Sequence, residues 1–313
     1  MRLGFDVGGT KTDAVVTDGA GRIVARTRRP TAWGPQGVVD TVLGLVDELA
    51  EVPGVAASPF TSIGIGMPGQ VAPGTSIVTH AVNLGVDELD LGAAVGARLG
   101  MPVAAENDVK AAALGAHALS RQSRGGDARS TVAYLNLGTG VAAGLVCRGR
   151  LWRGAHGTAG EVGHISVAPD GPLCKCGQRG CIEAFCGGAA IAERWGRPGA
   201  LPVRDVFDAA DAGDPDAVAL RGGLAYGVAA AVRVIVLSGD VDAVVIGGGI
   251  TALGGRMIGP VVAELEASAA ASPFLRSLRL PERVELLPPG SPAAALGASI
   301  LGASNAEEII THG

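Results

Sequence analysis

One succession of strand, Gly/Thr turn and strand occurs twice in this chain. The first copy begins at Leu3 and reads LGFDVGGTKTDAVVTDGAGR, and the second begins at Ala133 and reads AYLNLGTGVAAGLVCRGR. When the turn glycines are aligned, Asn136 takes the place of Asp6. Such a duplication predicts two similar α/β lobes, each opening with a β-hairpin whose turn faces a cleft between the lobes. Ligands bind in clefts of that kind.

The hydrophobic pattern places further helices and buried strands between and after these hairpins. Apolar residues at helical spacing predict helices, and short apolar runs bounded by turn residues predict buried strands. The last helix is Ala-rich and follows a Pro/Gly loop, so we expect it to pack back onto the first lobe. The N-terminal lobe is accordingly assigned to residues 1–115 with 293–313, and the C-terminal lobe to residues 116–292. Helices are expected at 38–49, 108–119, 215–237 and 293–301, and strands at 61–66, 102–107 and 241–247.

The charge and composition exclude several classes of protein. A formal net charge of −5 without a run of basic residues lacks the electrostatic footprint of a nucleic-acid binder, so DNA and anionic membranes are not expected partners. The first residues, MRLGFDVGGTKT, hold no signal peptide, and we expect a cytoplasmic protein. The longest apolar stretch, from Leu224 to Leu237, is shorter than a membrane span and contains Arg233, which predicts a buried core helix.

Three glycine turns at strand ends predict a nucleotide site. Glycine lets backbone N–H groups approach a phosphate, and Thr and Lys add hydroxyl and ammonium donors. A single Gly-Gly turn is usually structural, but three together favour a nucleotide cleft. Asp6, at the end of the first strand, suits Mg²⁺ bound through water and suits turn capping equally well. The turn residues are Gly8, Gly9, Thr10 and Lys11 in the first, Gly138, Thr139 and Gly140 in the second, and Gly247, Gly248 and Gly249 in the third.

A polar triplet, Glu106-Asn107-Asp108, lies where a predicted strand meets the following helix. Asp108 fits two roles there. It can cap the N-terminus of the helix, or it can accept the proton of a hydroxyl during phosphoryl transfer, since ligands bind at the strand ends of α/β sheets. The spacing alone favours neither role.

The segment GEVGHISVAPDGPLCKCGQRGCIE, from Gly160 to Glu183, predicts a zinc site. It supplies three cysteines and one histidine, a set suited to tetrahedral Zn²⁺, with glycines that allow a tight turn between ligands. Because four protein ligands close the coordination sphere, the metal should be structural. The predicted ligands, which we call the zinc knuckle (164–181), are His164, Cys174, Cys176 and Cys181.

The zinc knuckle should fix the loop that carries Glu161 and Glu183. Their carboxylates can accept hydrogen bonds from sugar hydroxyls, or they can form surface ion pairs. Loss of zinc should therefore damage a sugar site before the phosphate turns, which lie elsewhere in the sequence, and should leave nucleotide binding measurable. The remaining cysteines, Cys147 and Cys186, are expected to be buried thiols outside the metal site.

Taken together, these motifs resemble the ROK family of sugar kinases and related repressors. The resemblance covers nearly the whole chain and implies a two-lobed α/β fold of the actin/hexokinase (ribonuclease H-like) ATPase type with a central interlobe cleft. It further implies an ATP-dependent sugar kinase with Mg²⁺ and a structural Zn²⁺. The motifs that carry it are DVGGTKT at Asp6, GMPG at Gly66, ENDV at Glu106, LGTG at Leu137, GEVGH at Gly160, CKCGQRGCIE at Cys174 and GGG at Gly247.

The same resemblance assigns roles to individual residues. It makes Asp108 the general base toward the reacting sugar hydroxyl, and it makes His164 serve twice, with one ring nitrogen on zinc and the other on the sugar. It places Asp6 and the three glycine turns where the family handles Mg-ATP. The residues expected to bind the sugar are Asn83, Asn107, Asp108, Glu161, His164 and Glu183.

The chain departs from the family pattern at three places, which leaves the identity of the hexose open. Ala142 replaces a glycine after LGTG, Asn136 stands where threonine is common, and the segment around Asn83 reads AVNLGVDEL where the family often has a Pro-Asn-Leu-Pro type of segment. Glucose is the first choice of substrate. N-acetylmannosamine, N-acetylglucosamine, fructose and allose remain alternatives, and polyphosphate remains an alternative to ATP.

Two other classes of function compete with a sugar kinase. ROK repressors share this body but carry an additional N-terminal helix-turn-helix domain, whereas this sequence starts directly with the first phosphate-loop strand and keeps DVGGTKT intact. An actin-like or chaperone ATPase needs neither the sugar-loop carboxylates nor the zinc knuckle. We therefore expect a kinase that forms a homodimer or homotetramer, as the family resemblance suggests.

Overall fold

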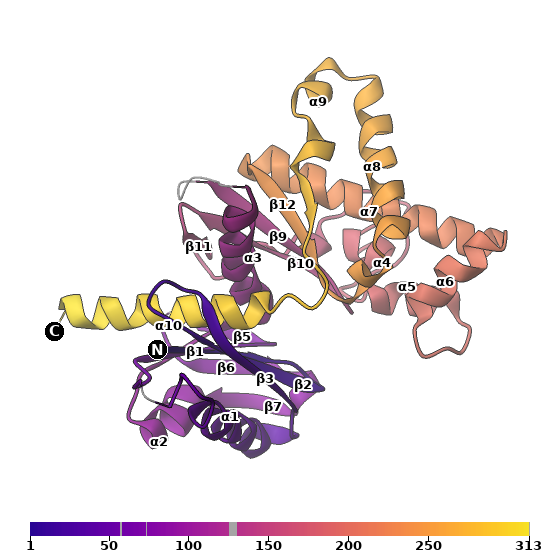
Figure 1. The fold of residues 1–313 in the computed structure, drawn as a ribbon. Helices are drawn as coiled ribbons and strands as arrows, with labels where there is room; N and C mark the ends of the chain where they lie inside the picture. Colours follow the sequence, from indigo (N-terminus) through magenta and orange to yellow (C-terminus); the bar gives the residue numbers. More distant parts are fainter. Residues whose placement is uncertain (57, 73, 125–129, 313) are drawn as a thin grey trace. The chain divides into compact units, whose positions relative to one another are not determined.

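The computed structural model describes residues 1–56, 58–72, 74–124 and 130–312. The chain divides into two compact units. Figure 1 labels the helices and strands along the ribbon. The first unit comprises Met1–Arg129, Gly144–Ala159 and Ser291–Gly313. The second comprises Ser130–Ala143 and Gly160–Gly290.

The core of the first unit is a five-stranded sheet of order β3-β2-β1-β4-β8. β1 (Arg2–Val7) pairs antiparallel with β2 (Lys11–Thr17), which pairs antiparallel with β3 (Ile23–Pro30). On its other side β1 runs parallel to β4 (Ser62–Met67), and β4 runs parallel to β8 (Val103–Asn107). The three parallel strands therefore end at one edge of the sheet, and polar side chains that follow them come together there.

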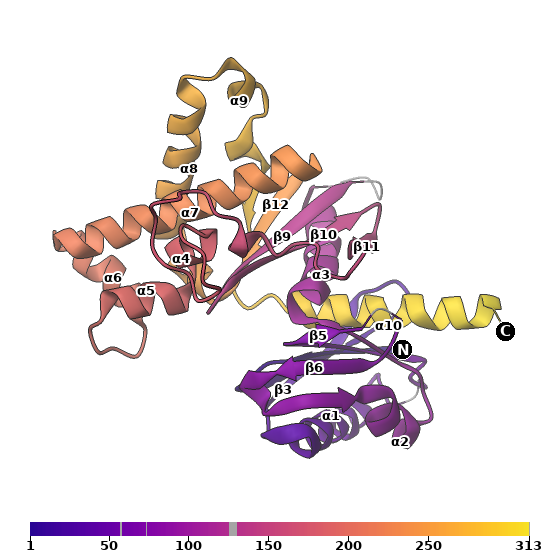
Figure 2. The same ribbon diagram turned by 180° about the vertical axis from the view of Figure 1, so that it is seen from behind.

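Two helices cover the opposite faces of this sheet, as Figures 1 and 2 show from two sides. α1 (Gly34–Ala50) buries the apolar positions that its sequence spacing predicts, and α10 (Ala293–His312) packs on β1, β4, β8 and α3 (Asp108–Arg124). The close approach of α10 requires glycine in the strands. A methyl group on Gly4 would lie 2.1 Å from the Ala295 carbonyl oxygen, and one on Gly64 would lie 1.7 Å from that of Ala298.

A three-stranded sheet of order β5-β6-β7 completes the first unit. Its strands are β5 (Gln70–Val71), β6 (Ile77–Ala81) and β7 (Val86–Asp90). The 3₁₀ helix η1 (Val82–Leu84) lies between β6 and β7, and the π-helix η2 (Gly92–Gly96) leads into α2 (Ala97–Leu99). This sheet is absent from the sequence-based prediction because its strands are short and mostly half-exposed, which weakens the period-two signal.

The second five-stranded sheet has the order β11-β10-β9-β12-β13. Its strands are β9 (Thr131–Leu137), β10 (Val141–Cys147), β11 (Arg150–Trp152), β12 (Ala243–Gly247) and β13 (Val284–Leu286). β12 runs parallel to β9, with Gly247 opposite Asn136. The turn after β9 and the glycines after β12 consequently lie at the same edge of the sheet.

The helices of the second unit include one long apolar element, α7 (Pro215–Gly239). Pro215 occupies its first turn, and the Asp214 carboxylate caps it by accepting from the backbone N–H groups of Asp216 and Ala217. The other helices are η3 (Val162–His164), α4 (Ile182–Cys186), α5 (Gly188–Trp195), α6 (Pro202–Asp211), η4 (Gly249–Leu253), α8 (Gly255–Ala270), α9 (Pro273–Ser277) and η5 (Leu280–Arg283).

α7 is longer than the apolar stretch that the sequence pattern marks out. Among the described residues it is the one helix that could cross a membrane by length and composition, so the argument from insufficient length is wrong. However, 61% of its apolar window is buried inside the structure, which is the behaviour of a core helix.

Candidate active site

The turn between β1 and β2 lies against the helix η1. The backbone N–H of Gly8 donates to the Lys11 carbonyl oxygen over 3.0 Å and closes the turn. A methyl group on Gly9 would lie 3.0 Å from the Asn83 carbonyl oxygen, so a larger residue would fit tightly against η1 there. Thr10, Lys11 and Asn83 are all exposed. The structure thus brings a predicted sugar residue, Asn83, next to the first predicted phosphate turn.

Asp108 is the first residue of α3 and directly follows β8. The side-chain oxygen of Asn107 accepts from the backbone N–H groups of Val109 and Lys110, at 3.0 and 3.4 Å. The Asn107 amide nitrogen donates to the Gly69 carbonyl oxygen over 3.2 Å. Asn107 therefore performs much of the helix capping that the sequence would also allow Asp108 to perform, although Asp108 accepts from Val109 as well.

Asp6 and Asp108 lie at the same edge of the sheet, because β1, β4 and β8 are parallel. Burial, with the neighbouring carboxylates of Asp108 and Asp13, raises the pKa of Asp6 from 3.8 to about 7. Burial also raises the pKa of Asp108, although the backbone N–H of Val109 opposes the change. Two half-buried carboxylates at the same edge of a sheet favour the binding of a proton or a cation.

Glu106 and Lys110 fasten a loop onto the start of α3. The buried Glu106 carboxylate accepts from the backbone N–H of Asn107 over 3.0 Å and from Arg153 Nε over 2.7 Å. Lys110 Nζ donates to the carbonyl oxygen of Gly157. The Arg153–Ala159 loop, closed by the Ala159 N–H to Arg153 carbonyl bond, is thereby tied at two points to the strand and helix that carry Asp108.

This arrangement gives a stability prediction. Arg153→Met should lower the free energy of unfolding by about 1–3 kcal/mol, because it leaves the buried Glu106 carboxylate without its charged partner. Urea denaturation followed by circular dichroism measures the loss. Arg98→Met is the matched control, since Arg98 and Asp40 form an exposed pair 3.9 Å apart. This variant should lose under about 0.5 kcal/mol. Equal losses in the two variants would show that the Glu106–Arg153 pair does not support the fold.

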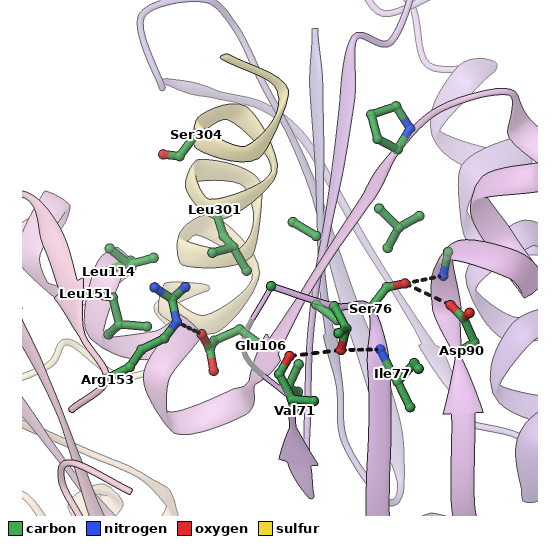
Figure 3. A pocket seen from close by; sticks show the side chains of 18 of the residues that line it. Val71, Ser76, Ile77, Asp90, Glu106, Leu114, Leu151, Arg153, Leu301 and Ser304 are labelled. Atoms are coloured by element: carbon green, nitrogen blue, oxygen red, sulfur yellow. Dashed lines mark hydrogen bonds and ion pairs between the residues drawn. The ribbon is translucent and has the colours of Figure 1, made fainter. Parts of the chain in front are cut away.

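Glu106 and Arg153 also line a cavity of about 680 Å³ within the first unit. Figure 3 shows Arg153 reaching Glu106 at one end and Ser76 bonded to Asp90 at the other. None of the residues predicted to bind sugar, nucleotide or metal lines it. The cavity is therefore not the predicted active site.

In the second unit, the two remaining glycine turns meet at the edge formed by β9 and β12. The backbone N–H of Gly138 donates to the Gly140 carbonyl oxygen over 3.1 Å. Gly248 has φ of +95°, and a methyl group there would lie 2.4 Å from the Leu137 carbonyl oxygen. A methyl group on Gly247 would meet the Tyr134 ring at 2.5 Å, whereas Gly249 has open space. Close packing thus explains why glycine is needed at positions 247 and 248. Gly249, the first residue of η4, has no such neighbour.

The four predicted zinc ligands come together in the second unit. Their nearest ligand atoms all lie within 4.8 Å of one another, with 3.6 Å between Cys176 Sγ and Cys181 Sγ and 3.9 Å between Cys174 Sγ and His164 Nδ1. Tetrahedral zinc with Zn–S bonds of about 2.3 Å separates sulfurs by about 3.8 Å, so the donor set fits the ion. The backbone N–H of Gln178 lowers the pKa of the Cys176 thiol to about 6, which favours the thiolate that zinc binds.

The knuckle holds this geometry through its turn. Cys174 donates its backbone N–H to the Gln178 carbonyl oxygen over 2.8 Å, and Gly177 donates to that of Cys174 over 2.9 Å. Gly177 takes φ of +92°, which favours glycine. Outside the cluster, Cys186 is buried as expected, but Cys147 is exposed, so the expectation of a buried thiol is wrong there.

The two predicted sugar-binding carboxylates of this unit differ in surroundings. Glu161 is exposed just before η3. Glu183 lies in the first turn of α4, and its Oε2 accepts from the backbone N–H of Val141 over 2.9 Å. His164 is exposed and turns Nδ1 toward Cys174, which leaves Nε2 for another partner. The predicted sugar residues are thus divided between the units, with Asn83, Asn107 and Asp108 in the first.

A sequence model of the ROK family matches residues 2–304. This chain belongs to the ROK family. The glucokinase of Halalkalibacterium halodurans is 31% identical over 85% of this chain and 86% of its own length. The N-acetylmannosamine kinase of Citrobacter koseri is 34% identical over 79% of this chain and 83% of its own length. The crystal structure of a ROK family glucokinase from Streptomyces griseus, in complex with glucose and AMPPNP, superposes with a TM-score of 0.75, covering 97% and 99% of the two chains at 29% identity.

The ROK match confirms the predicted fold class. This chain has the α/β fold of the two-lobed actin/hexokinase-like ATPases, which is also the fold of ROK sugar kinases. The duplicated hairpin of the sequence appears as β1–β2 and β9–β10, each followed by further strands of its own sheet.

The sequence did not predict three hydrogen bonds that shape the site in this ROK protein. They run from Arg153 to Glu106, from Lys110 to the Gly157 carbonyl oxygen, and from the Val141 N–H to Glu183. Glu106 carried a signal, because a carboxylate inside a buried strand requires a partner. No sequence signal identified Arg153 as that partner, since the residues around it do not indicate that it contacts β8.

Proposed function

We propose that this chain is an ATP-dependent hexose kinase whose preferred acceptor is glucose and whose product is glucose 6-phosphate. The observation that carries the proposal is the pair of half-buried carboxylates, Asp6 and Asp108, at the strand edge beside the Gly8–Lys11 turn. Such an edge provides a base for the acceptor hydroxyl and a place for a cation beside phosphate-binding backbone. The glucokinase relative and the likeness to a glucose-bound ROK structure support the choice of sugar.

In this mechanism Asp108 accepts the proton of the sugar 6-hydroxyl as the hydroxyl oxygen attacks the γ-phosphorus of ATP. The bond between the γ-phosphorus and the β–γ bridging oxygen breaks, and ADP leaves with that oxygen. Burial assists Asp108, because the raised pKa makes its carboxylate a better proton acceptor.

Asp6 is the residue that we propose to hold Mg²⁺, through water molecules. Its surroundings support the assignment, because burial and the carboxylates of Asp108 and Asp13 together raise the pKa of Asp6, and a bound cation would offset both effects. When bound, Mg²⁺ would neutralise charge on the β- and γ-phosphates. The backbone N–H groups of the turns at Gly8, Gly138 and Gly247 would orient the phosphates.

We propose that Asn83, Asn107, Glu161, His164 and Glu183 bind the other sugar hydroxyls. The zinc knuckle would act as a structural element: the Cys₃His set leaves no open coordination position, and zinc on His164 Nδ1 leaves Nε2 to donate to the sugar. For the assembled enzyme we propose a homodimer or homotetramer, on the ROK resemblance alone.

N-acetylmannosamine is the second candidate substrate, since a relative of comparable identity is an N-acetylmannosamine kinase. The test is kcat/KM for ADP release with glucose, N-acetylmannosamine, N-acetylglucosamine, fructose and allose. Glucose should exceed each of the others by at least about tenfold, a factor that one or two additional hydrogen bonds supply. A higher kcat/KM for any other sugar would replace glucose as the assigned substrate while leaving the kinase assignment intact.

A further inference from the structure

The helix that follows the zinc knuckle is bonded directly to a phosphate turn. The Glu183 carboxylate, in the first turn of α4, accepts from the buried backbone N–H of Val141, which immediately follows Gly140. The contact is close: a methyl group on Gly140 would lie 2.6 Å from Glu183 Oε2. A charged acceptor on a buried backbone N–H is among the stronger protein hydrogen bonds.

The start of α5 donates hydrogen bonds to carbonyl groups of the same turn. The backbone N–H of Gly188 donates to the Gly138 carbonyl oxygen, and that of Ala189 donates to the Thr139 carbonyl oxygen, both over 2.9 Å. A methyl group on Gly188 would lie 2.8 Å from the Gly138 carbonyl oxygen. The turn Gly138–Gly140 is therefore bonded to one short segment, 183–189, through the carbonyl groups of Gly138 and Thr139 and through the N–H of Val141 that follows it.

That segment closely follows a predicted metal ligand, Cys181. Cys181 is the residue before α4, and its carbonyl oxygen accepts from the Ala184 N–H over 3.0 Å. Cys181 also forms a β-bridge with Ser166, and the Ile182 N–H donates to the Ile165 carbonyl oxygen over 3.1 Å. Both ends of the knuckle thus set where α4 starts, and α4 sets where Glu183 points.

We infer that Glu183 is a positioning residue for the phosphate turn Gly138–Gly140, in addition to its proposed contact with the sugar. One carboxylate then links the sugar-binding loop to the nucleotide-binding turn within a single unit. This inference rests on the proposed function, because it requires that the turn binds a nucleotide and that Glu183 binds the sugar. It also refines the expectation that loss of zinc damages the sugar site before the phosphate turns, since this turn is bonded to the helix that follows the zinc knuckle.

The decisive test is the affinity of Glu183→Ala for the Mg²⁺ complex of AMPPNP in the absence of sugar, measured by calorimetry. The variant should bind about tenfold more weakly than the wild type, because the turn loses a charged acceptor. Glu183→Gln should stay within about threefold, since its amide oxygen can still accept from the Val141 N–H. Glu266→Ala, which removes an exposed carboxylate of α8 in the same unit, is the matched control and should bind normally.

A reciprocal variant lies in the turn itself. Gly140→Ala would push the flexible end of Glu183 aside, so glucose affinity measured without nucleotide should fall by about three- to tenfold. Wild-type nucleotide affinity in Glu183→Ala would overturn the inference, and so would wild-type glucose affinity in Gly140→Ala. If Glu183→Ala fails to fold, Gly140→Ala decides alone. Failure of the proposed function is distinguishable, because the wild-type protein itself would then bind neither AMPPNP nor glucose.

Discussion

Asp108→Asn should lower kcat by about 10²- to 10⁴-fold while glucose affinity stays within about threefold of the wild type. An amide cannot take the hydroxyl proton, but it keeps the size and the hydrogen-bonding reach of the carboxylate. The fold should survive, because Asn107 still caps α3 through Val109 and Lys110. Steady-state ADP release gives kcat, and calorimetry with glucose gives the affinity.

The matched control for this prediction is Asp87→Asn, which makes the same chemical change at an exposed position of β7. Its kcat should equal that of the wild type. If Asp108→Asn retains more than about a tenth of wild-type kcat, the barrier has risen by less than about 1.4 kcal/mol, and Asp108 is not the base.

Cys176→Ser should lose its zinc and bind glucose at least about tenfold more weakly, whereas the wild-type protein should contain one Zn²⁺ per chain. The proposed ion would hold His164 and the start of α4, and these would position the proposed sugar contacts of His164 and Glu183. Nucleotide binding should weaken but remain measurable, because the first unit keeps its own phosphate turn. Elemental analysis of the purified proteins and calorimetry with each ligand measure these effects.

Cys147→Ser is the control for the loss of a thiol, because Cys147 is exposed and lies outside the knuckle. It should keep both zinc and glucose affinity. A fully active wild-type preparation without stoichiometric zinc would contradict the structural role of the metal. Normal glucose affinity in Cys176→Ser would show that the knuckle does not organise the sugar site.

Local patterns correctly predicted both hairpins, the strands β4, β8 and β12, and the helices α1, α3, α7 and α10, but not the remaining elements. The hairpins β1–β2 and β9–β10 follow from strands that flank Gly/Thr turns, and α7 begins at Pro215 as its capping sequence indicates. α1 starts at Gly34, earlier than the apolar spacing from Val38 suggests, because the first turn of a helix need not be apolar. Boundaries of this kind depend on capping and packing and not on hydrophobic period.

Contacts between distant segments could not be predicted. Gly4 and Gly64 are visible in the sequence, but the sequence does not show that α10 presses on both. The bond between Glu183 and Val141 likewise joins residues 42 positions apart. Such contacts depend on strand order and register, which no local pattern specifies. The zinc knuckle was easier to predict, because all four ligands lie within one short segment and zinc chemistry constrains their spacing.

A hexose kinase passes the γ-phosphoryl group of ATP to a sugar and not to water. One reaction of the purified chain with Mg-ATP and glucose, followed by ADP release and by ³¹P NMR, tests this transfer directly. We expect ADP and glucose 6-phosphate to form in equal amounts, with negligible ADP when glucose is omitted. ADP and inorganic phosphate released equally fast without sugar, or no ADP with any of the five sugars, would contradict the assignment as a hexose kinase.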